Sequence, residues 1–327
     1  MIDSSGGFEP TYTSGELLIF GGSASGELTD KVCSYLGVHR GKAVSSRFPD
    51  GETLVKLEED VRGNDCFVVQ STCPPVNDNL VELLIFIDCL RRASARRITA
   101  VIPYYGYARQ DRKAEGRTPI TAKLVANMIT TAGAHRVLTM NLHADQIQGF
   151  FDIPVDHLTA APVLAKHVVK RKLEKMVLVS PDVGNIKFGN EFATRIGSEL
   201  AVIHKKRISG DSTVAVSIIG SVENRSVMMF DDMIATAGTV CEAAKLVRKH
   251  DALDIFVGAT HGLFAGPALE RLLEADLNEI VVTDTIPVTS RIKEGLKNLT
   301  VLSVANLIGE AIRRIHDHKS VSALFVH

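Results

Sequence analysis

The chain has 327 residues, of which 45% are hydrophobic and 23% charged, and its formal net charge at pH 7 is -1. This composition fits a globular protein of about two domains and excludes a chain that is disordered throughout. A net charge near zero also excludes a broadly basic surface for nucleic acid, although local basic sites for small anions are compatible with it.

Residues 1–14 are polar and rich in Gly and Ser, and we expect them to form a flexible leader. They lack the basic start and apolar core of a signal peptide, and no apolar run reaches the roughly 18 residues that a membrane helix needs. We therefore predict a cytoplasmic protein. The five cysteines form no CxxC pair, which favours reduced, packed thiols over disulfides or a zinc site.

Short apolar runs alternate with helical segments along the rest of the chain. The predicted strands are Leu17–Phe20, Phe67–Gln70, Thr99–Ile102, Val137–Met140, Val177–Ser180, Ala201–His204, Val227–Phe230, Ile255–Ala259, Glu279–Thr283 and Leu299–Leu302. The predicted helices are Asn77–Ala93, Thr121–Ala132, Ala160–Lys172, Thr239–His250 and Ala305–His316. This alternation predicts an α/β fold with parallel sheets flanked by helices. Because ligands bind such sheets beyond the carboxyl ends of the strands, chemistry is expected in the loops after the strands.

A weak internal repeat divides the chain into two halves. FVVQSTCPP, a helix and ITAVIPYYG in the first half parallel VMMFDDMIA, a helix and IFVGATHG in the second. Two α/β domains of one type explain the pattern, although any two βαβ units look alike at this level. We place the domains at residues 15–160 and 161–311, with residues 312–327 packing back on the first domain.

The segment VMMFDDMIATAGT carries the strongest functional signal. An apolar strand is expected to end in Asp231 and Asp232, and a turn of small residues, Ala235–Thr239, then opens a helix. Backbone N–H groups at a helix N-terminus suit a phosphate dianion, and carboxylates suit sugar hydroxyls. The segment therefore predicts a site for a phosphorylated sugar, with a strand, turn and capped helix of purely structural role as the alternative.

Two further segments suit a nucleotide. In PYYGYARQDRK, Arg109 is placed to pair with phosphate oxygens and Gln110 to hydrogen-bond a base or ribose. In RFPDGE, a turn presents the ring of Phe48 for stacking and the carboxylates of Asp50 and Glu52 as acceptors. A solvated charged loop and an ordinary PDG turn are the structural alternatives.

Three other positions follow predicted strands. His143, in NLHADQ, stands where a metal ligand is expected, and Asp182, in SPDVGN, is a similarly placed carboxylate. In HKKRISGDST, three basic residues precede a Ser- and Gly-containing stretch, which we interpret as a mobile loop able to close over a transferring phosphoryl group. A solvated charge run is the competing interpretation. The sequence contains no Walker A motif, GxGxxG or GxSxG.

Taken together, these segments resemble one family, ribose-phosphate diphosphokinase, also called phosphoribosyl pyrophosphate synthetase. The resemblance extends from about Leu17 to Phe325 and rests on the ordered series RFPDGE, QSTCPPVNDNLVELL, IPYYGYARQDRK, NLHADQIQGFFDIPVD, SPDVG, KKR, DDMIATAGT, TDTIP and SVSALF. It implies two tandem phosphoribosyltransferase type I-like domains. The implied reaction moves the β,γ-diphosphoryl group of ATP to the C1 hydroxyl of ribose 5-phosphate, with Mg2+ required.

The resemblance also implies roles for individual residues, matched motif by motif. Phe48, Asp50, Gly51, Glu52, Arg109 and Gln110 match ATP-binding positions; Lys205 and Arg207 match the catalytic basic pair; Arg207, Asp231, Asp232, Ala235, Thr236, Ala237, Gly238 and Thr239 match the ribose 5-phosphate site; His143 and Asp182 match metal-linked positions; and Ser46, Arg47, Ser320, Ser322 and Phe325 resemble a regulatory site for inorganic phosphate and ADP between subunits. A homo-oligomer, usually a hexamer, is implied as well.

Two departures from the family pattern bear on function. Ala235 stands where an Asp is common, and HKKRIS replaces DKRRPR, so that His204 replaces an acid and Ser209 a base. Ala235 favours a catalytically inert regulatory partner as one alternative, whereas the intact basic pair and carboxylates oppose it. A phosphoribosyltransferase, which consumes phosphoribosyl pyrophosphate, is the other alternative; RFPDGE and YARQ speak against it.

Overall fold

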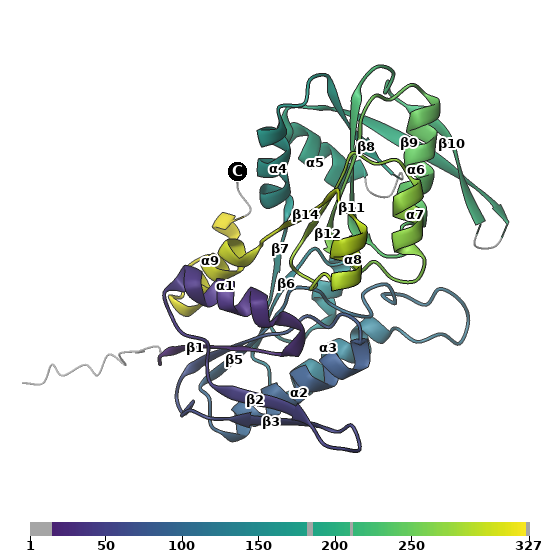
Figure 1. Cartoon of the computed structure of the whole chain (residues 1–327). Coiled ribbons are helices and arrows are strands. Elements are labelled where there is room, and N and C mark those ends of the chain that lie inside the picture. Colours follow the sequence, from purple (N-terminus) through teal and green to yellow (C-terminus); the bar gives the residue numbers. More distant parts are fainter. Residues whose placement is uncertain (1–14, 182–185, 210–211, 325–327) are drawn as a thin grey trace, which may run out of the picture.

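The computed structural model describes residues 15–181, 186–209 and 212–324, and within these the chain forms two sheets with helices packed on them (Figure 1). The first sheet has five parallel strands in the order β1-β4-β5-β6-β7. Its strands are β1 (Leu17–Gly21), β4 (Asp65–Val69), β5 (Arg97–Ile102), β6 (Arg136–Met140) and β7 (Val155–Leu158). The helical elements of this half are η1 (Ser23–Ser25), α1 (Gly26–Leu36), α2 (Val76–Arg92), α3 (Thr121–Ala132) and η2 (Asp145–Phe150).

A separate two-stranded hairpin, β2 (Ala43–Arg47) and β3 (Thr53–Leu57), is inserted between β1 and β4. It lies at the lower end of the molecule beside α2 (Figure 1). Along β3, Val55 is buried, whereas Val44 and the three residues after it in β2 are exposed. The hairpin thus packs on the first half mainly through β3.

The second sheet has seven strands in the order β10-β9-β8-β11-β12-β13-β14, all parallel to their neighbours except for the antiparallel pair β9 and β10. Its strands are β8 (Met176–Ser180), β9 (Glu199–Ser209), β10 (Ser212–Ile219), β11 (Ser226–Ile234), β12 (Ile255–Gly262), β13 (Glu279–Thr283) and β14 (Leu299–Leu302). Its helical elements are α4 (Ala161–Arg171), α5 (Ile186–Ile196), α6 (Gly238–Lys249), α7 (Ala268–Glu274), α8 (Ser290–Gly295), α9 (Ala305–His316) and η4 (Ser322–Leu324).

The central strands of both sheets, such as β4 and β12, are buried along their whole length, which explains why they are largely apolar runs rather than alternating ones. In β1, Ile19 packs into the cluster that contains α1, α4 and α9, while its neighbour Phe20 packs against α2 and α3. In β11, Met228 belongs to the first of these clusters and Met229 to the cluster under α6 and α7. The shared cluster links the two halves.

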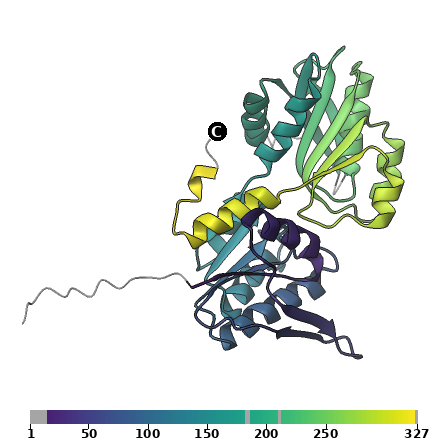
Figure 2. The ribbon, with the colours of Figure 1, turned by 60° about the vertical axis from the view of Figure 1, so that its left-hand side comes forward.

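The C-terminal helix α9 returns to the first half and packs beside α1 (Figure 2). Arg97 of β5 donates to the backbone carbonyl of Ile315 over 3.0 Å and pairs with the buried Asp65 of β4. His316 Nδ1 lies 2.9 Å from the same Asp65 carboxylate. These polar contacts fix the end of α9 at the amino ends of β4 and β5.

The predicted α/β fold with parallel, helix-flanked sheets is confirmed, and several elements match residue for residue, including α3, α9, β13 and β14. The sequence analysis missed α1, the hairpin strands β2 and β3, β7, β10, α5, α7 and α8. The cysteines are confirmed as free among the described residues, and burial raises the pKa of Cys66 to about 12. No described helix is both long and apolar enough to cross a membrane.

Candidate active site

The carboxyl ends of the two sheets face each other, and buried polar side chains join them. The Nε2–H of His261, near the end of β12, donates to the backbone carbonyl of Asn141, just after β6, over 3.1 Å. Thr260 Oγ1 donates to the side-chain oxygen of Asn141 over 3.0 Å, and Ser71 Oγ donates to the carbonyl of Thr285 over 2.5 Å. The loops that follow strands of both sheets therefore meet at one interface between the sheets, which we call the joint.

His143 and Asp232 form a pair across this joint. His143 Nδ1 lies 2.6 Å from Asp232 Oδ2, and because a carboxylate only accepts, the hydrogen is on Nδ1. This hydrogen bond raises the pKa of His143 above its ordinary value, against the effect of burial. Burial by itself would raise the pKa of Asp232, but hydrogen bonding with His143 and Asp231 lowers it below its ordinary value. The pair holds the imidazole in one orientation with Nε2 directed away from the carboxylate.

The strand that carries Asp231 and Asp232 is longer than predicted. We expected it to end at Phe230, but β11 continues to Ile234, with Met233 paired to His261 of β12. The two carboxylates therefore lie within the strand, and the prediction that they follow its end is wrong. The physical reason is that β12 also extends past its predicted end, so the parallel ladder continues.

The predicted turn at residues 235–239 opens α6 at Gly238, as expected. The N-cap residue Ala237 has a left-handed φ of 59°, and no described side chain caps the helix. Thr236 and Thr239 are exposed. Uncapped N–H groups at a helix start, beside two hydroxyls, form a ready site for an anion.

Two contacts from outside hold this turn in shape. Arg271 of α7 donates from Nη1 to the carbonyl of Thr236 over 3.0 Å. The N–H of Ala265 donates to the carbonyl of Ala235 over 2.9 Å. Because the backbone carbonyls of Ala235 and Thr236 already accept hydrogen bonds from the protein, the conformation of the turn is set without a ligand. The sequence analysis did not identify Arg271, which no local pattern connects with this turn.

Arg109 and Gln110 line a cavity of about 450 Å³ together with Val76, Tyr104 and Tyr107. Tyr104 also packs against His261 with ring centroids 5.0 Å apart, which places the cavity at the joint between the two sheets. Gln110 Oε1 accepts from Thr121 Oγ1 over 2.5 Å. The structure thus brings the predicted nucleotide residues of this loop together with His143 and Asp232.

The predicted turn of RFPDGE is confirmed as the tip of the β2–β3 hairpin. Its Phe48 N–H donates to the carbonyl of Glu52 over 2.9 Å, and Gly51, with a φ of 94°, supplies a conformation that other residues rarely adopt. Asp50 Oδ1 accepts from the Glu52 N–H over 3.1 Å, and the ring of Phe48 is 48% exposed. The hairpin lies far from β11 and α6 in Figures 1 and 2, so one chain does not bring this turn to residues 235–239.

The basic segment after Ile203 is not a loop as predicted. β9 continues through Ser209 and pairs antiparallel with β10, with Lys205 opposite Ala215 and Arg207 opposite Thr213. The pairing explains the error, because a charged run at the edge of a sheet needs only backbone partners to form a strand. The backbone of Lys205 and Arg207 is described, whereas their side chains lie outside the described part.

The remaining predicted residues are spread over the molecule. Asp182 and Phe325 lie outside the described residues. Arg47 pairs with Asp78 over 2.8 Å, and the carbonyl of Ser320 accepts from Arg314 over 3.1 Å. Ser46 and Ser322 are exposed. Since the hairpin and η4 lie apart in both ribbon views, one chain does not assemble these residues into a single site (Figures 1 and 2).

Comparisons with known proteins agree with one another. Residues 17–133 match the family described as the N-terminal domain of ribose phosphate pyrophosphokinase, and residues 208–326 match the phosphoribosyl synthetase-associated domain. The ribose-phosphate pyrophosphokinase of Rhodopirellula baltica is 57% identical over 95% of this chain and 98% of its own length. That of Thermotoga maritima is 51% identical over 95% of this chain and 99% of its own.

The chain belongs to the ribose-phosphate pyrophosphokinase family. Its fold agrees with the crystal structure of phosphoribosylpyrophosphate synthetase from Mycobacterium smegmatis, with a TM-score of 0.86, 42% identity and coverage of 93% of this chain and 99% of the other. These comparisons confirm the family resemblance recognised in the sequence and the enzymatic function that it implied. The ATP-dependent chemistry of a ribose-phosphate pyrophosphokinase is also consistent with a metal cofactor.

Three residues at the joint of this pyrophosphokinase, the buried Tyr104 and His261 and the partly buried Asn141, were not identified from sequence. Tyr104 packs edge-on against His261 with ring centroids 5.0 Å apart, and Asn141, in the left-handed region with a φ of 39°, accepts from His261. The THG sequence at the end of a predicted strand was a usable signal for His261. Its partner Asn141 had none, because their contact joins residues 120 positions apart.

His261 makes the stability of the joint dependent on pH. Complete burial lowers its pKa to about 4, whereas in the unfolded chain it is about 6.5. As the pH falls below 6.5, the unfolded chain binds a proton that the folded chain does not, so stability present above pH 6.5 is lost towards pH 4. Urea unfolding between pH 7 and 4.5 should show a loss approaching about 1.4 kcal/mol per pH unit from this group.

The matched variants are His261→Gln and His39→Gln, the latter at an exposed position. We expect His261→Gln to flatten the dependence of unfolding free energy on pH and His39→Gln to leave it as in the wild type. An unchanged slope in His261→Gln contradicts the assignment.

Proposed function

We propose that this ribose-phosphate pyrophosphokinase binds ribose 5-phosphate at the end of β11 and ATP in the adjoining cavity. The reaction moves the β,γ-diphosphoryl group of ATP to the C1 hydroxyl of ribose 5-phosphate, giving phosphoribosyl pyrophosphate and AMP. The observation that carries the proposal is the convergence of the uncapped turn at 235–239, the His143–Asp232 pair and the cavity of Arg109 at one joint.

The sugar phosphate is assigned to residues 235–239. The free N–H groups at the start of α6 and the hydroxyls of Thr236 and Thr239 donate to the phosphate, as helix N-termini commonly do. Asp231 and Asp232 accept from the ribose hydroxyls. Replacing the family's usual Asp by Ala235 removes a negative charge next to the dianion while leaving these donors in place. We therefore expect phosphate binding here to be retained.

ATP is assigned to Arg109 and Gln110 within one chain and to the hairpin turn of a second copy. Arg109 pairs with phosphate oxygens, and Gln110 hydrogen-bonds the nucleoside. Phe48 stacks on adenine, with Asp50, Gly51 and Glu52 around its edge. Because the turn is far from residues 235–239 in its own chain, a neighbouring subunit has to supply it.

Mg2+ is proposed as the metal, entering with ATP. This ion binds through one or two carboxylates together with substrate phosphates, and it supplies positive charge to the transferring group. The described residues contain no group of three metal-ligating side chains, which fits an ion held largely by substrate. His143 fits the site because Nδ1–H is held by Asp232, the arrangement usual for a metal-ligating imidazole. Asp182, outside the described residues, is the second proposed position.

In the proposed reaction the C1 oxygen of ribose 5-phosphate forms a bond to the β-phosphorus of ATP. The bond from that phosphorus to the α,β-bridging oxygen breaks, AMP leaves with the electron pair, and the proton of the C1 hydroxyl is released to water. Such a transfer depends on positioning and on neutralising charge rather than on a covalent enzyme intermediate. Lys205 and Arg207 supply positive charge from β9, and Arg207 also contacts ribose 5-phosphate.

One assay tests the activity. The purified chain is incubated with ATP, Mg2+ and ribose 5-phosphate, and AMP and phosphoribosyl pyrophosphate are measured by chromatography over a range of phosphate concentrations. We expect both products in equal amounts. No AMP at any phosphate concentration would support an inert regulatory partner, and consumption of added phosphoribosyl pyrophosphate with a free base would support a phosphoribosyltransferase.

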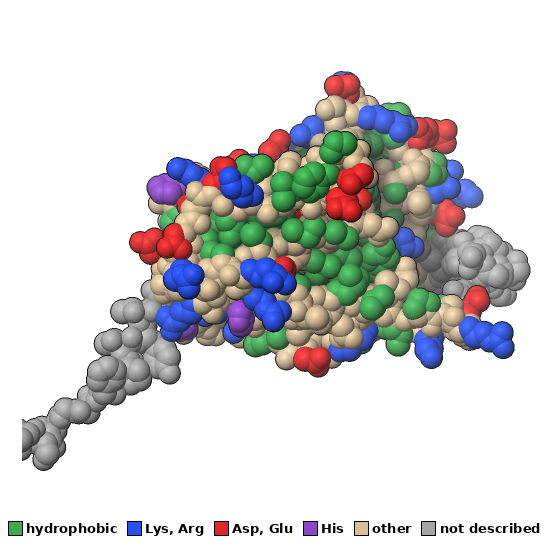
Figure 3. Space-filling view, turned by 90° about the horizontal axis from the view of Figure 1, so that it is seen from below, with side chains coloured by type: hydrophobic (Ala, Val, Ile, Leu, Met, Phe, Trp, Pro, Cys, Tyr) green, Lys and Arg blue, Asp and Glu red, His purple; other side chains and the backbone are tan. Residues whose placement is uncertain are grey.

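A homo-oligomer, most simply a hexamer, is proposed as the active form. Hydrophobic side chains gather on the face formed by the lower end of the molecule (Figure 3). The exposed apolar residues of the elements at this end include Val44, Leu54, Val81, Leu124 and Met128. Apolar patches of this kind commonly mark contacts between proteins. We also propose Ser46, Arg47, Ser320, Ser322 and Phe325 as a site between subunits for inorganic phosphate and ADP.

Mixing two variants that are impaired in different ways, at an ATP concentration near the wild-type KM, tests the shared site. Phe48→Ala damages the turn that a chain contributes to the site of its neighbour. Lys205→Ala damages the part of the site that lies within the chain itself. In a mixed pair, one of the two sites is intact, so random mixing should restore about a quarter of wild-type activity. The measurement is AMP formation after the variants are dissociated and reassembled together. If each site uses its own turn, the mixture stays as impaired as its components.

A further inference from the structure

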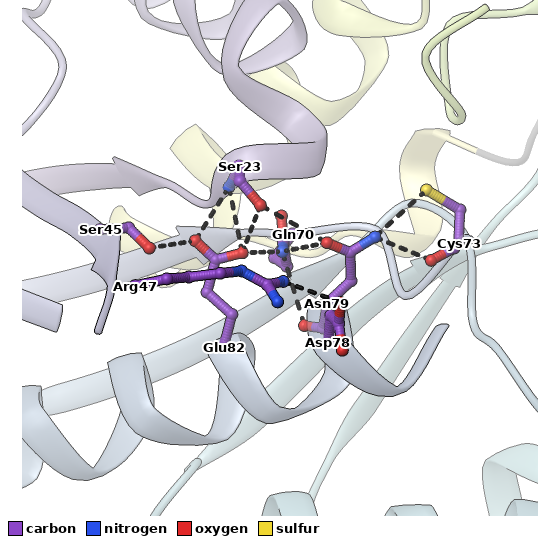
Figure 4. Close-up of polar contacts among 8 residues, drawn as sticks. All are labelled: Ser23, Ser45, Arg47, Gln70, Cys73, Asp78, Asn79 and Glu82. Carbon is purple, nitrogen blue, oxygen red and sulfur yellow. Dashed lines mark hydrogen bonds and ion pairs between the residues drawn. The ribbon is translucent and has the colours of Figure 1, made fainter. Parts of the chain in front are cut away.

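A buried carboxylate outside the active site joins three segments of the first half. Glu82 of α2 is 3% exposed, and none of the described ion pairs includes it. Its Oε1 accepts from Ser45 Oγ over 2.6 Å and from the Ser23 N–H over 3.1 Å. Its Oε2 accepts from Ser23 Oγ over 2.5 Å and from Gln70 Nε2 over 2.7 Å. Figure 4 shows these groups converging on the carboxylate.

The partners of Glu82 require a group that only accepts. The orientation of Gln70 is fixed because its Oε1 accepts from the Ala24 N–H over 3.1 Å, so its Nε2 must donate. The backbone N–H of Ser23 can only donate as well. A Gln at position 82 would place its amide hydrogens against one of these two donors in either orientation of the amide. An ionised Glu satisfies both oxygens at once.

The hydrogen bond to Ser45 fastens the exposed strand of the hairpin. Residues 44–47 of β2 are exposed, so they bury little apolar surface against the body. Beyond the ladder with β3, this strand is attached by the bond from Ser45 to Glu82 and by the ion pair of Arg47 with Asp78. Both acceptors lie on α2. Ser45 is three residues from Phe48, where the proposed nucleotide turn begins.

A series of hydrogen bonds leads from the same carboxylate towards the cavity of its own chain. Gln70 lies 3.4 Å from Asn79 Oδ1, and Asn79 Nδ2 donates to the carbonyl of Cys73 over 2.8 Å. The neighbouring Thr72 N–H donates to the carbonyl of Tyr104, which lines the cavity. Glu82 therefore lies between the Phe48–Glu52 turn, which is proposed to enter the site of a neighbouring subunit, and the Arg109 cavity of its own chain.

We propose that Glu82 is a positioning residue for nucleotide binding, which holds the β2–β3 turn at a fixed place on the body through Ser45. The proposal rests on the assignment of Phe48–Glu52 to ATP. Glu82 touches no substrate; it acts by limiting the orientations that the turn samples before ATP binds. A preorganised turn loses less freedom on binding, so its effect falls on ATP affinity rather than on the chemical step.

Ser45→Ala tests the proposal directly. The residue is exposed, so the change leaves the core intact while removing the hydroxyl. We expect KM for ATP to rise roughly tenfold, the factor that loss of one hydrogen bond to a charged group typically produces. The kcat, the KM for ribose 5-phosphate and the Tm should stay as in the wild type. Ser45→Thr keeps the hydroxyl on a residue favoured in strands and should restore KM.

Two controls separate positioning from general damage. Ser34→Ala makes the same chemical change at an exposed position of α1 for which the described residues show no side-chain hydrogen bond, and it should change nothing. In a Glu82→Gln background, Ser45→Ala should cause no further rise in KM, because the acceptor through which it acts has already been altered. Additive effects of the two changes would overturn the proposal. So would a fall in Tm and kcat together with an unchanged KM for ATP.

A further variant separates failure of the Glu82 proposal from failure of the assignment of the Phe48–Glu52 turn to ATP. Phe48→Ala is measured alongside. If it raises KM for ATP while Ser45→Ala does not, the turn binds ATP and the role of Glu82 is refuted. If neither variant raises KM, the assignment of the turn to ATP fails, and the proposal falls with it.

Discussion

Replacing Lys205 or Arg207 by Ala should lower kcat by about three to five orders of magnitude, the range known for cations that stabilise a transferring phosphoryl group. Both residues lie on β9, two positions apart, in an antiparallel ladder with β10 that is in continuous register from 205 to 207 and irregular on either side. The hairpin of β9 and β10 projects from the edge of the second sheet (Figure 1). If its cations act chiefly on charge that develops during transfer, they contribute to the transition state far more than to bound ATP.

Steady-state kinetics with ATP and ribose 5-phosphate check this expectation. KM for ATP should change only severalfold while kcat falls. Lys206→Ala is the matched control, because successive positions of a strand alternate between its faces and position 206 belongs to the face opposite 205 and 207. It should retain near wild-type turnover. A variant at 205 or 207 with normal kcat and poor ATP affinity would refute the assignment.

The architecture could be predicted from the sequence because its signals are local. β13 is buried along its whole length and contains an apolar run, and α9 carries a regular apolar face, so both were placed to the residue. The elements that were missed have weak local signals. β2 is exposed along most of its length and β10 is an edge strand, so their pairing rather than their composition makes them strands.

The candidate site was predictable in part for the same reason. The turn at 235–239, Arg109 and His143 all follow strands, and the rule for parallel sheets directs attention to such loops. What the sequence does not contain is the pairing across the joint. The bonds of His143 to Asp232 and of His261 to Asn141 link residues 89 and 120 positions apart. No spacing rule reaches that far without the fold.

The His143–Asp232 pair gives the second large expected effect. Asp232→Asn keeps the size of the side chain and one accepting oxygen but removes the charge that faces Nδ1–H. Partners that orient a metal-linked imidazole typically contribute ten- to a hundredfold, so we expect kcat/KM to fall by about that factor. Since the hydrogen bond to Asp232 is the main cause of the raised pKa of His143, that pKa should also fall towards its ordinary value.

A double-mutant cycle decides whether the two residues act as one unit. If His143 works through the orientation that Asp232 imposes, His143→Ala should lower kcat at least as much as Asp232→Asn, and the double variant should have a kcat no lower than that of His143→Ala alone, while loss of the contact between Asp232 and ribose raises KM for ribose 5-phosphate. Asp111→Asn is the matched control: its charge also raises the pKa of His143, but only as a minor cause. It should therefore shift both the pKa and kcat/KM less. Fully additive losses, or an Asp111→Asn variant as impaired as Asp232→Asn, would mean that Asp232 contributes bulk negative charge rather than a defined imidazole orientation.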